Sequence, residues 1–386
     1  MTAHSNDAPP SRMCPRCVLD ESVPGFRFEK DGTCNYCHMQ DALEREFPLG
    51  EEGARCLERL ADEIRREGRG RAYDCVVGVS GGRDTCYCLH YVKEVMGLRP
   101  LAVHFDNGWD SDIAKTNLAR LCDALDVELH TIIMDWPDSR ELTNANIRAC
   151  VPYIDIMDDV GIASALYRTA AKEGLRHIIM SHSFREEGVT PLAWNYMDAR
   201  FARTIIRRHA TAPLKTFQNV DLHHMLYWMI FKGIRLVNIT NYYDDTGDKV
   251  EQLLSEKYGW VDTGQHHMDN EMFALVYHFA RHKFGFDWRV VELSAKVRTG
   301  VISRDDALKA LQTRPFFETD EMVDYCLKKQ CMSREEYNSI LKAPNKFFTD
   351  YPSYYPLLRM FKYPIKLLCR RHILPAHVYE KFFEAI

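Results

Sequence analysis

Residues 80–85 read Ser-Gly-Gly-Arg-Asp-Thr and lie between a predicted strand and a predicted helix. The strand, residues 73–79, is almost entirely apolar. The helix carries apolar side chains at positions 88, 91, 92, 95 and 96, the spacing of one helix face, and Gly97 provides a stop signal. A glycine-rich turn at a helix N-terminus lets backbone N–H groups approach a phosphate, and the helix dipole favours its negative charge. The stretch therefore predicts a nucleotide phosphate site.

The sequence of this loop limits the classes of nucleotide-binding loop to which it can belong. It lacks the G-x-x-x-x-G-K-[ST] pattern of a Walker loop and the G-x-G-x-x-G pattern of a dinucleotide site. It resembles instead the loop of the PP-loop ATP pyrophosphatases. That resemblance implies that a substrate oxygen attacks the α-phosphate of ATP, so that an adenylated substrate forms and pyrophosphate leaves. The alternative is an ordinary strand-to-helix turn rich in small residues.

Four of the thirteen cysteines form two Cys-x-x-Cys pairs, Cys14 with Cys17 and Cys34 with Cys37. Two such pairs sixteen residues apart predict a structural zinc site with four thiolate ligands and no open coordination position. Turn signals between the pairs favour a small β-ribbon. Two alternatives remain open, namely four unpaired cysteines or a site in which His38 replaces one ligand.

Strands alternating with helices predict an α/β fold with a doubly wound parallel sheet. The expected strands are 73–79, 101–105, 128–134 and 177–180, and a helix is expected over 162–172. Ligands bind at the carboxyl ends of such strands, where polar clusters occur at 80–85, 106–109, 135 and 181–188. We predict a zinc ribbon (1–45), a helical connector (46–70), a PP-loop domain of the adenine nucleotide alpha hydrolase-like type (71–248) and a mostly helical C-terminal region (249–386).

The composition is that of an ordinary soluble protein, with 46% hydrophobic and 27% charged residues. The net charge of −5 argues against a protein that coats nucleic acid. No apolar run is long enough to span a membrane, the segment 225–231 is expected to be a buried helix, and the N-terminus lacks a signal-peptide core. We expect a cytoplasmic protein with no membrane partner.

The C-terminal stretch 356–383 interleaves apolar side chains with arginines and lysines. A membrane-surface helix is one interpretation. We favour a packing helix or a contact between copies of the chain, because Pro364 and Pro375 interrupt the stretch.

Taken together, the motifs resemble those of bacterial N-acetyl sugar amidotransferases of lipopolysaccharide and O-antigen biosynthesis. The matching segments are the cysteine pairs, the loop 80–85, 106–109, 181–188, 191, 194–198 and the block from 258–260 to 282–287. The resemblance implies that ATP adenylates the acetamido oxygen of a nucleotide-linked N-acetyl sugar. Ammonia then displaces AMP and leaves an acetamidino sugar, while Mg²⁺ and a cation neutralise the pyrophosphate.

Site roles follow from this resemblance. The expected ATP-binding residues are Ser80, Gly81, Gly82, Arg83, Asp84, Thr85, His104, Asp106 and Ser181. The expected catalytic residues are Asp84, as a ligand for Mg²⁺ or as a helix-capping carboxylate, Lys283, as the pyrophosphate cation, and Glu187, which binds metal or positions ammonia. The expected substrate residues are His182, Arg185, Trp194, Asp198 and His266. His266 stands where the family is expected to carry a lysine, which indicates an altered sugar.

The chain has neither a cysteine directly after Met1 nor a G-x-C-x-G elbow, so it shows no glutaminase signature. The resemblance implies that a separate glutaminase supplies the ammonia, with a cyclase-like barrel protein as a relay. The main alternative is a PP-loop tRNA thiolase, which adenylates a base oxygen before sulfur attacks. The acidic charge and the lack of a further Cys-x-x-Cys pair speak against it. A third interpretation is a zinc-ribbon binding protein whose loop no longer catalyses.

Overall fold

The computed structural model describes residues 12–243, 247–262, 270–370 and 379–384. Its centre is a five-stranded parallel sheet in the order β3-β2-β1-β4-β5. The strands are β1 (Cys75–Gly78), β2 (Pro100–Asp106), β3 (Leu129–Ile133), β4 (His177–Met180) and β5 (Arg235–Asn238). The predicted α/β class and parallel sheet are confirmed. β5 was missed because its four residues carry only two apolar side chains and no alternation of the kind that marks a strand.

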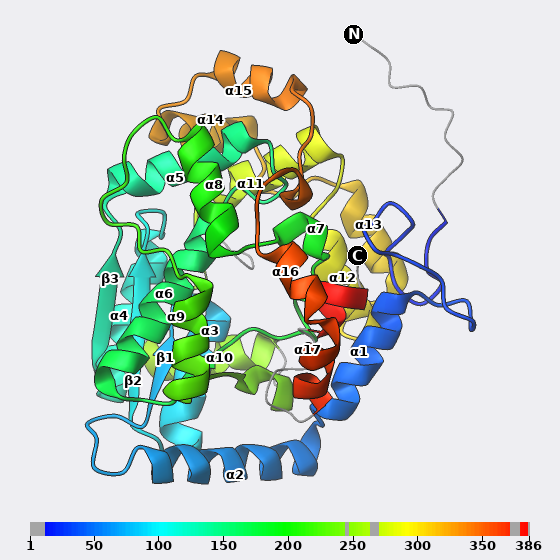
Figure 1. The fold of residues 1–386 in the computed structure, drawn as a ribbon. Coiled ribbons are helices and arrows are strands. Elements are labelled where there is room, and N and C mark those ends of the chain that lie inside the picture. The colour runs from blue at the N-terminus through cyan, green and yellow to red at the C-terminus, as the bar shows by residue number, and fades with distance from the viewer. Residues whose placement is uncertain (1–11, 244–246, 263–269, 371–378, 385–386) are drawn as a thin grey trace.

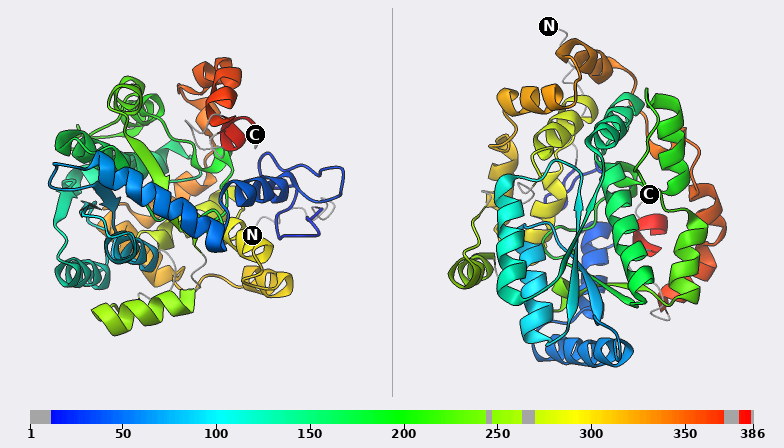
Figure 2. Two further views of the ribbon diagram at one scale, coloured as in Figure 1. Left: turned by 90° about the horizontal axis from the view of Figure 1, so that it is seen from below. Right: turned by 90° about the vertical axis from the view of Figure 1, so that its left-hand side faces the viewer.

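Helices cover both faces of the sheet (Figures 1 and 2). One face packs against α2 (Gly50–Glu67), α3 (Arg83–His90), α4 (Asp112–Leu125) and α10 (Gly247–Tyr258). The other packs against α6 (Ile156–Glu173), α9 (Leu222–Leu226) and the π-helical turn η2 (Tyr227–Phe231). The doubly wound arrangement leaves the carboxyl ends of the strands open between the two layers.

The N-terminal segment is less regular than a β-ribbon. Within its described part, antiparallel pairing is limited to two isolated bridges, Met13 with Asp20 and Phe28 with Cys34. Helix α1 (Asn35–Glu46) begins directly after Cys34, so the second cysteine pair lies on its first turn. The predicted connector 46–70 is mainly helix α2.

The remaining elements pack around the upper edge of the sheet in Figure 1 and onto the N-terminal segment. The α-helices are α5 (Trp136–Ala149), α7 (Leu192–Asn195), α8 (Ala199–His209), α11 (Phe273–Phe279), α12 (Arg289–Arg298), α13 (Arg304–Gln312), α14 (Asp320–Lys329), α15 (Arg334–Lys342), α16 (Tyr355–Met360) and α17 (Lys362–Arg370). The shorter turns are η1 (Tyr91–Val95), η3 (Ile239–Tyr242), η4 (Ala280–Phe284), η5 (Phe348–Asp350) and η6 (Glu380–Glu384).

The apolar segment 225–231 is helical, as predicted, but it is not buried. Ile230 is 68% exposed and Phe231 78% exposed, whereas Trp228 of η2 is buried and stacks on Tyr167 of α6, and Met229 is partly buried beside it. An apolar run therefore predicted the helix but not its surroundings. None of the described helices is both long and apolar enough to cross a membrane.

Candidate active site

The loop after β1 is shaped for a bound anion. Gly81 has φ +90°, and a Cβ atom there would lie 2.1 Å from the carbonyl oxygen of Ala114 on α4. Glycine alone tolerates both this backbone and this close approach. Gly82, in extended conformation, is the N-cap residue of α3. The N-terminus of α3 thus adjoins the loop, as helix N-termini do in phosphate sites.

The loop is braced by its own hydroxyl groups and by a distant tryptophan. The Ser80 N–H donates to Thr85 Oγ1 at 3.2 Å, and the Thr85 hydroxyl donates to the Gly82 carbonyl at 3.1 Å. The Trp260 indole N–H donates to the Gly81 carbonyl at 3.1 Å. The block around Trp260, which carried part of the family resemblance, therefore helps to fix the loop.

A cavity of about 530 Å³ opens beside the loop, a size typical of small-ligand sites. Its walls come from the loop, the carboxyl ends of β2 and β4, the start of α6 and one residue of α12. Most predicted site residues line it: Ser80, Gly82, Arg83, Asp84, Thr85, His104, Ser181, His182 and Glu187. Gly81 lies within the loop, and Asp106 accepts the Gly108 N–H at the end of β2.

Arg83 connects the loop to two other elements. Its guanidinium group contacts Asp84 at 2.7 Å, Glu186 at 2.8 Å and Glu251 at 3.5 Å. Burial opposes its charge, but these carboxylates raise the pKa of Arg83 above its ordinary value. Asp84 thus lies beside a fixed cation on the cavity wall, and a carboxylate is a ligand type that Mg²⁺ accepts.

His104 lies near the carboxyl end of β2, and each of its ring nitrogens has a polar neighbour. Its Nδ1 lies 3.0 Å from the Val79 carbonyl, and its Nε2 lies 3.1 Å from Asp110 Oδ2. Burial favours the neutral ring, but Asp110 outweighs it and raises the pKa of His104. Since both neighbours are acceptors, the imidazolium form satisfies both contacts by donating twice.

Three carboxylates face the loop from the start of α6, and the sequence analysis missed them. Asp155, Asp158 and Asp159 all line the cavity, and Asn107 donates a hydrogen bond to Asp158. Burial raises the pKa of Asp155 to about 6 and that of Asp159 to about 7, and it raises the pKa of Asp158 well above its ordinary value. Three acids within five residues of an otherwise apolar stretch were the available signal.

The turn after β4 pairs His182 with Glu187. His182 Nδ1 contacts Glu187 Oε2, and the Ser183 N–H donates to Glu187 Oε1 at 3.1 Å. The Glu187 carboxylate raises the pKa of His182. The pair lies at the edge of the cavity, with the His182 side chain 54% exposed, so it is accessible to a ligand that enters from solvent.

Two cations reach this region from the C-terminal part of the chain. Lys296 of α12 lines the cavity and contacts Glu292 at 2.5 Å. Lys381 of η6 faces Asp159, and its burial lowers its pKa to about 8. The sequence analysis did not select either lysine, because nothing in the local sequence distinguishes them from surface lysines.

The structure places four predicted residues elsewhere. Lys283 is buried and donates to the carbonyls of Ile340 and Ala343 at 2.7 and 2.9 Å, so it caps the end of α15 instead of facing the loop. Its assignment as the pyrophosphate cation is therefore corrected, since its ammonium group is committed to those carbonyls.

The other three residues, Trp194, Asp198 and Arg185, make contacts within the fold and do not line the cavity. Trp194 stacks on Phe286 with ring centroids 3.9 Å apart. Asp198 is the N-cap of α8 and accepts the N–H of Phe201 at 2.7 Å. Arg185 donates to the Phe47 carbonyl at 2.6 Å, which ties the turn after β4 to the N-terminal segment. The remaining substrate residue, His266, lies outside the described residues.

The four cysteines converge as predicted. All four are fully buried, and three of their Sγ–Sγ distances are 3.6, 3.7 and 3.8 Å. A tetrahedral zinc ion with Zn–S bonds of about 2.3 Å requires an edge of about 3.8 Å, so the four thiolates fit that ion. His38 instead pairs with Asp31 at 3.1 Å, which does not support its role as a replacement ligand.

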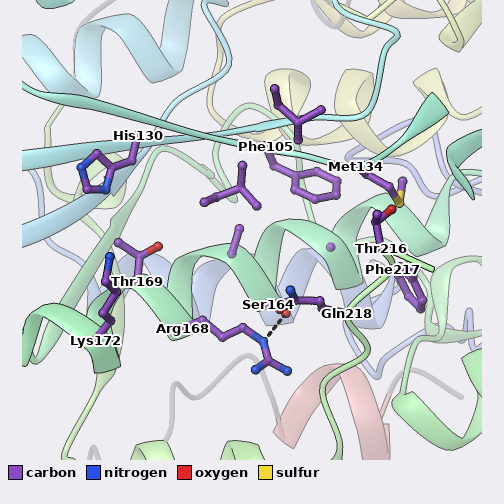
Figure 3. A pocket seen from close by; sticks show the side chains of 14 residues that line it. Phe105, His130, Met134, Ser164, Arg168, Thr169, Lys172, Thr216, Phe217 and Gln218 are labelled. Atoms are coloured by element: carbon purple, nitrogen blue, oxygen red, sulfur yellow. Dashed lines mark hydrogen bonds between the residues drawn. The ribbon is translucent and has the colours of Figure 1, made fainter.

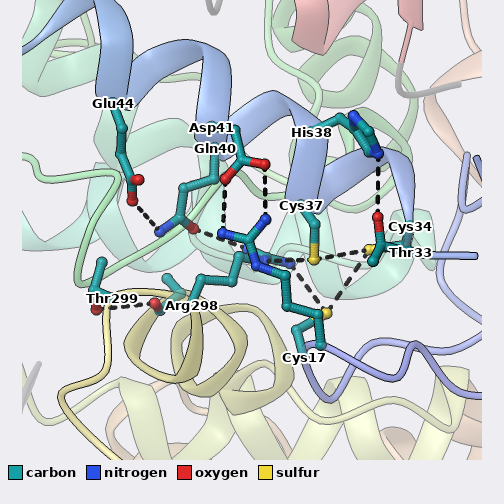
Figure 4. A network of polar contacts seen from close by, with 12 residues as sticks. Cys17, Thr33, Cys34, Cys37, His38, Gln40, Asp41, Glu44, Arg298 and Thr299 are labelled. Atoms are coloured by element: carbon teal, nitrogen blue, oxygen red, sulfur yellow. Dashed lines mark hydrogen bonds and ion pairs between the residues drawn. The ribbon is translucent and has the colours of Figure 1, made fainter. Parts of the chain in front are cut away.

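Helix α12 links this cysteine cluster to the cavity. Arg298 donates to the Sγ atoms of Cys17 and Cys37, each at 3.4 Å (Figure 4). The thiolates outweigh the effect of burial and raise the pKa of Arg298. Arg298 and Lys296 lie on one helix, so α12 connects the cysteine cluster to the wall of the cavity.

A second hollow of about 230 Å³ lies between the edge strand β3 and α6 (Figure 3). It is mostly apolar, with Phe105, Met134 and Phe217 around it and Arg168 hydrogen-bonded to Ser164. None of the described predicted site residues lines it. The loop cavity is therefore the candidate active site.

Comparison with protein families identifies the C-terminal part of the chain. Residues 240–364 match the model of the "LPS biosynthesis protein WbpG-like, C-terminal domain". This segment contains Trp260, which holds the loop, and Lys296. For this part of the chain, the match supports the predicted relationship to a family of lipopolysaccharide biosynthesis.

Other similarities are more distant. The uncharacterised protein MJ1599 of Methanocaldococcus jannaschii is 21% identical over 262 residues, which cover 66% of this chain and 78% of that protein. Among solved structures, NMN synthetase from Francisella tularensis is 14% identical over 73% of this chain and 96% of its own, with a TM-score of 0.31. The NH3-dependent NAD synthetase of Campylobacter jejuni is 12% identical over 76% of this chain and 98% of its own, with a TM-score of 0.29. The U34-tRNA thiolase of Methanococcus maripaludis is 10% identical over 80% of this chain and 89% of its own, with a TM-score of 0.28. Likeness at this level says nothing of the reaction.

Proposed function

We propose that this protein is an ATP-dependent amidotransferase that converts the acetamido group of a nucleotide-linked N-acetyl sugar into an acetamidino group. The observation that carries the proposal is the cavity that an anion-binding loop shares with three carboxylates, of which Asp155 and Asp158 are buried and Asp159 is partly buried. The match of residues 240–364 to a lipopolysaccharide biosynthesis domain favours a sugar as the acceptor.

The first step would be adenylation. The acetamido oxygen attacks the α-phosphate of ATP, the bond to the β-phosphate breaks, and pyrophosphate leaves. The N–H groups around Gly82 would bind the phosphates, and Mg²⁺ held by Asp84 would neutralise the charge that develops on pyrophosphate. Lys296 takes the place proposed for Lys283 as the cation of the cavity.

The second step would be displacement by ammonia. Ammonia attacks the imidate carbon, a proton leaves the nitrogen, and the C–O bond to AMP breaks. A carboxylate whose pKa is raised to about 7 is suited to accept that proton near neutral pH. We assign this role to Asp159, which lines the same wall of the cavity as Asp155 and Asp158.

The protein partners and the nucleotide-linked sugar belong to the same proposal. A separate glutaminase would supply ammonia, with a cyclase-like barrel protein as a relay, and the reaction would take place in the cytoplasm. His182 and Glu187, at the exposed edge of the cavity, are placed to contact the nucleotide-linked sugar.

Exchange of labelled pyrophosphate into ATP tests the adenylation step. We expect exchange only when a nucleotide-linked N-acetyl sugar is present, and we expect Asp84→Asn to abolish it. Asp159→Asn is the matched variant, because it acts after adenylation and should retain exchange while losing amidine formation. Absence of exchange with every N-acetyl sugar would support the interpretation of a binding protein without catalysis.

The alternative of a tRNA thiolase makes a different prediction. None of the described residues that line the cavity is a cysteine, and Cys86, on α3, is buried in the core. Adenylation that depends on tRNA, with steeply salt-dependent tRNA binding, would favour that alternative.

A further inference from the structure

Exposed apolar side chains gather on two short helical segments away from the cavity. η2 exposes Ile230 (68%) and Phe231 (78%), and α16–α17 expose Met360 (78%) and Tyr363 (81%). Leu226, Tyr227, Leu357, Phe361 and Leu367 of the same segments are 39–50% exposed. Single exposed apolar residues are common, but a concentration of them marks an interaction surface.

These segments lie on one side of the molecule. Arg203 of α8 pairs with Asp221, the N-cap of α9, at 2.5 Å, and Arg200 of α8 donates to the carbonyl of Ser353, just before α16, at 3.4 Å. Figure 1 shows α8, α9, α16 and α17 at the front of the view, and the right panel of Figure 2 shows them along one edge. We call this side, residues 199–209, 222–231 and 355–370, the α8–α17 face.

The charge of this face differs from that of the whole chain, in which acidic residues outnumber Lys and Arg by 55 to 50. Residues 199–221 contain five Arg or Lys and one acid, Asp221, which pairs with Arg203, and residues 351–370 contain four basic residues and no acidic one. Residues 222–243 add Lys232 and Arg235, again without an acid. Arg207, Lys232 and Arg359 are exposed.

We propose that the α8–α17 face binds the protein to the surface of an anionic membrane. Short helices that expose aromatic and aliphatic side chains between basic ones bury the former at the headgroup boundary and pair the latter with lipid phosphates. Tyr227 and Tyr363 suit this boundary, because tyrosine has an apolar body and a polar tip.

Two other occupants fit this face less well. The core of a protein interface is depleted of charge, whereas here exposed basic side chains lie among the apolar ones. A nucleic acid would use the basic residues but would leave Ile230 and Phe231 in water. The inference is independent of the proposed reaction. It departs from our expectation that the C-terminal stretch is a packing helix or a contact between copies of the chain, and that no membrane is involved.

Cosedimentation of the full-length protein with vesicles tests the proposal. We expect binding to vesicles of phosphatidylcholine mixed with phosphatidylglycerol, weakening as salt rises, and little binding to phosphatidylcholine alone. Replacing Arg207, Lys232 and Arg359 by Gln should weaken binding about a hundredfold, because each basic residue near an anionic surface contributes about 1 kcal/mol and 1.4 kcal/mol is a factor of ten.

Ile230→Asp combined with Phe231→Asp should abolish binding while the protein keeps its cooperative unfolding. Val95→Asp is the matched control, because Val95 is 58% exposed and lies on η1, which packs on the opposite face of the sheet. Equal binding to neutral vesicles, no binding to anionic vesicles, or the same loss with Val95→Asp would overturn the proposal. So would a dimer, detected by light scattering, that the Ile230–Phe231 double variant dissociates, or RNA binding without vesicle binding.

Discussion

Replacement of Gly81 by alanine probes the geometry of the phosphate loop directly. The new Cβ would lie 2.1 Å from the Ala114 carbonyl oxygen, whereas ordinary contact begins near 3.4 Å. The loop and α4 would therefore have to separate by about 1.3 Å (3.4 − 2.1). A misplacement of about 1 Å at a reacting group costs on the order of 100-fold in rate. We expect pyrophosphate–ATP exchange by Gly81→Ala to fall by at least about that factor.

A second variant separates this displacement from backbone strain. Gly97 also has positive φ (+61°), but the nearest atom to a Cβ there is the Arg65 side chain, at 3.8 Å. Both substitutions incur the left-handed backbone cost of roughly 1–2 kcal/mol for alanine. Gly97→Ala should therefore lower the free energy of unfolding by about that amount and keep its exchange rate. Wild-type exchange by Gly81→Ala, or equal inactivation by Gly97→Ala, would refute the reasoning.

Three further perturbations test the surroundings of the loop. The pKa of Asp159 is raised to about 7 in the folded state, so the native protein holds a proton that the unfolded chain releases, and stability should fall as pH rises from about 4 to 7. Asp159→Asn should weaken the pH dependence of stability in denaturant titrations and raise the free energy of unfolding by more than about 1 kcal/mol at neutral pH. An unchanged pH profile would contradict the raised pKa of Asp159. Arg298→Gln should weaken zinc retention about 10- to 100-fold in chelator competition and raise the KM for ATP through Lys296 on the same helix, whereas Lys309→Gln on α13 should do neither. Lys283→Met should destabilise the fold by about 1–3 kcal/mol because two buried carbonyls lose their donor, with kcat unchanged; a selective loss of kcat would restore Lys283 to the site.

Sequence patterns were informative where the chemistry is local. The glycines of the loop and the spacing of the cysteines require particular backbone conformations and ligand distances, so residues 80–85 and the four cysteines form the predicted local structures. The four predicted strands are present with shifts of a few residues at their ends, because the parallel core demands apolar runs at those places.

Sequence patterns failed where tertiary contacts decide. Whether a lysine faces the loop or caps a helix depends on packing between distant segments. For this reason the sequence analysis wrongly assigned Lys283 to the loop and did not select Lys296. The acidic residues at the start of α6 could be recognised as site residues only from the structure, in which they line the same cavity as the loop. Segment 225–231 shows the same limit, because apolar content does not reveal whether a neighbouring segment covers it.

The central claim concerns the product, and mass spectrometry of the sugar tests it most directly. The purified protein would be incubated with ATP, Mg²⁺, isotopically labelled ammonium and a set of nucleotide-linked N-acetyl sugars. The account predicts one sugar that becomes slightly lighter than its substrate apart from the label, because NH replaces oxygen, with one labelled nitrogen gained and one AMP released per turnover. AMP release without a labelled sugar, or labelling without AMP, would contradict it.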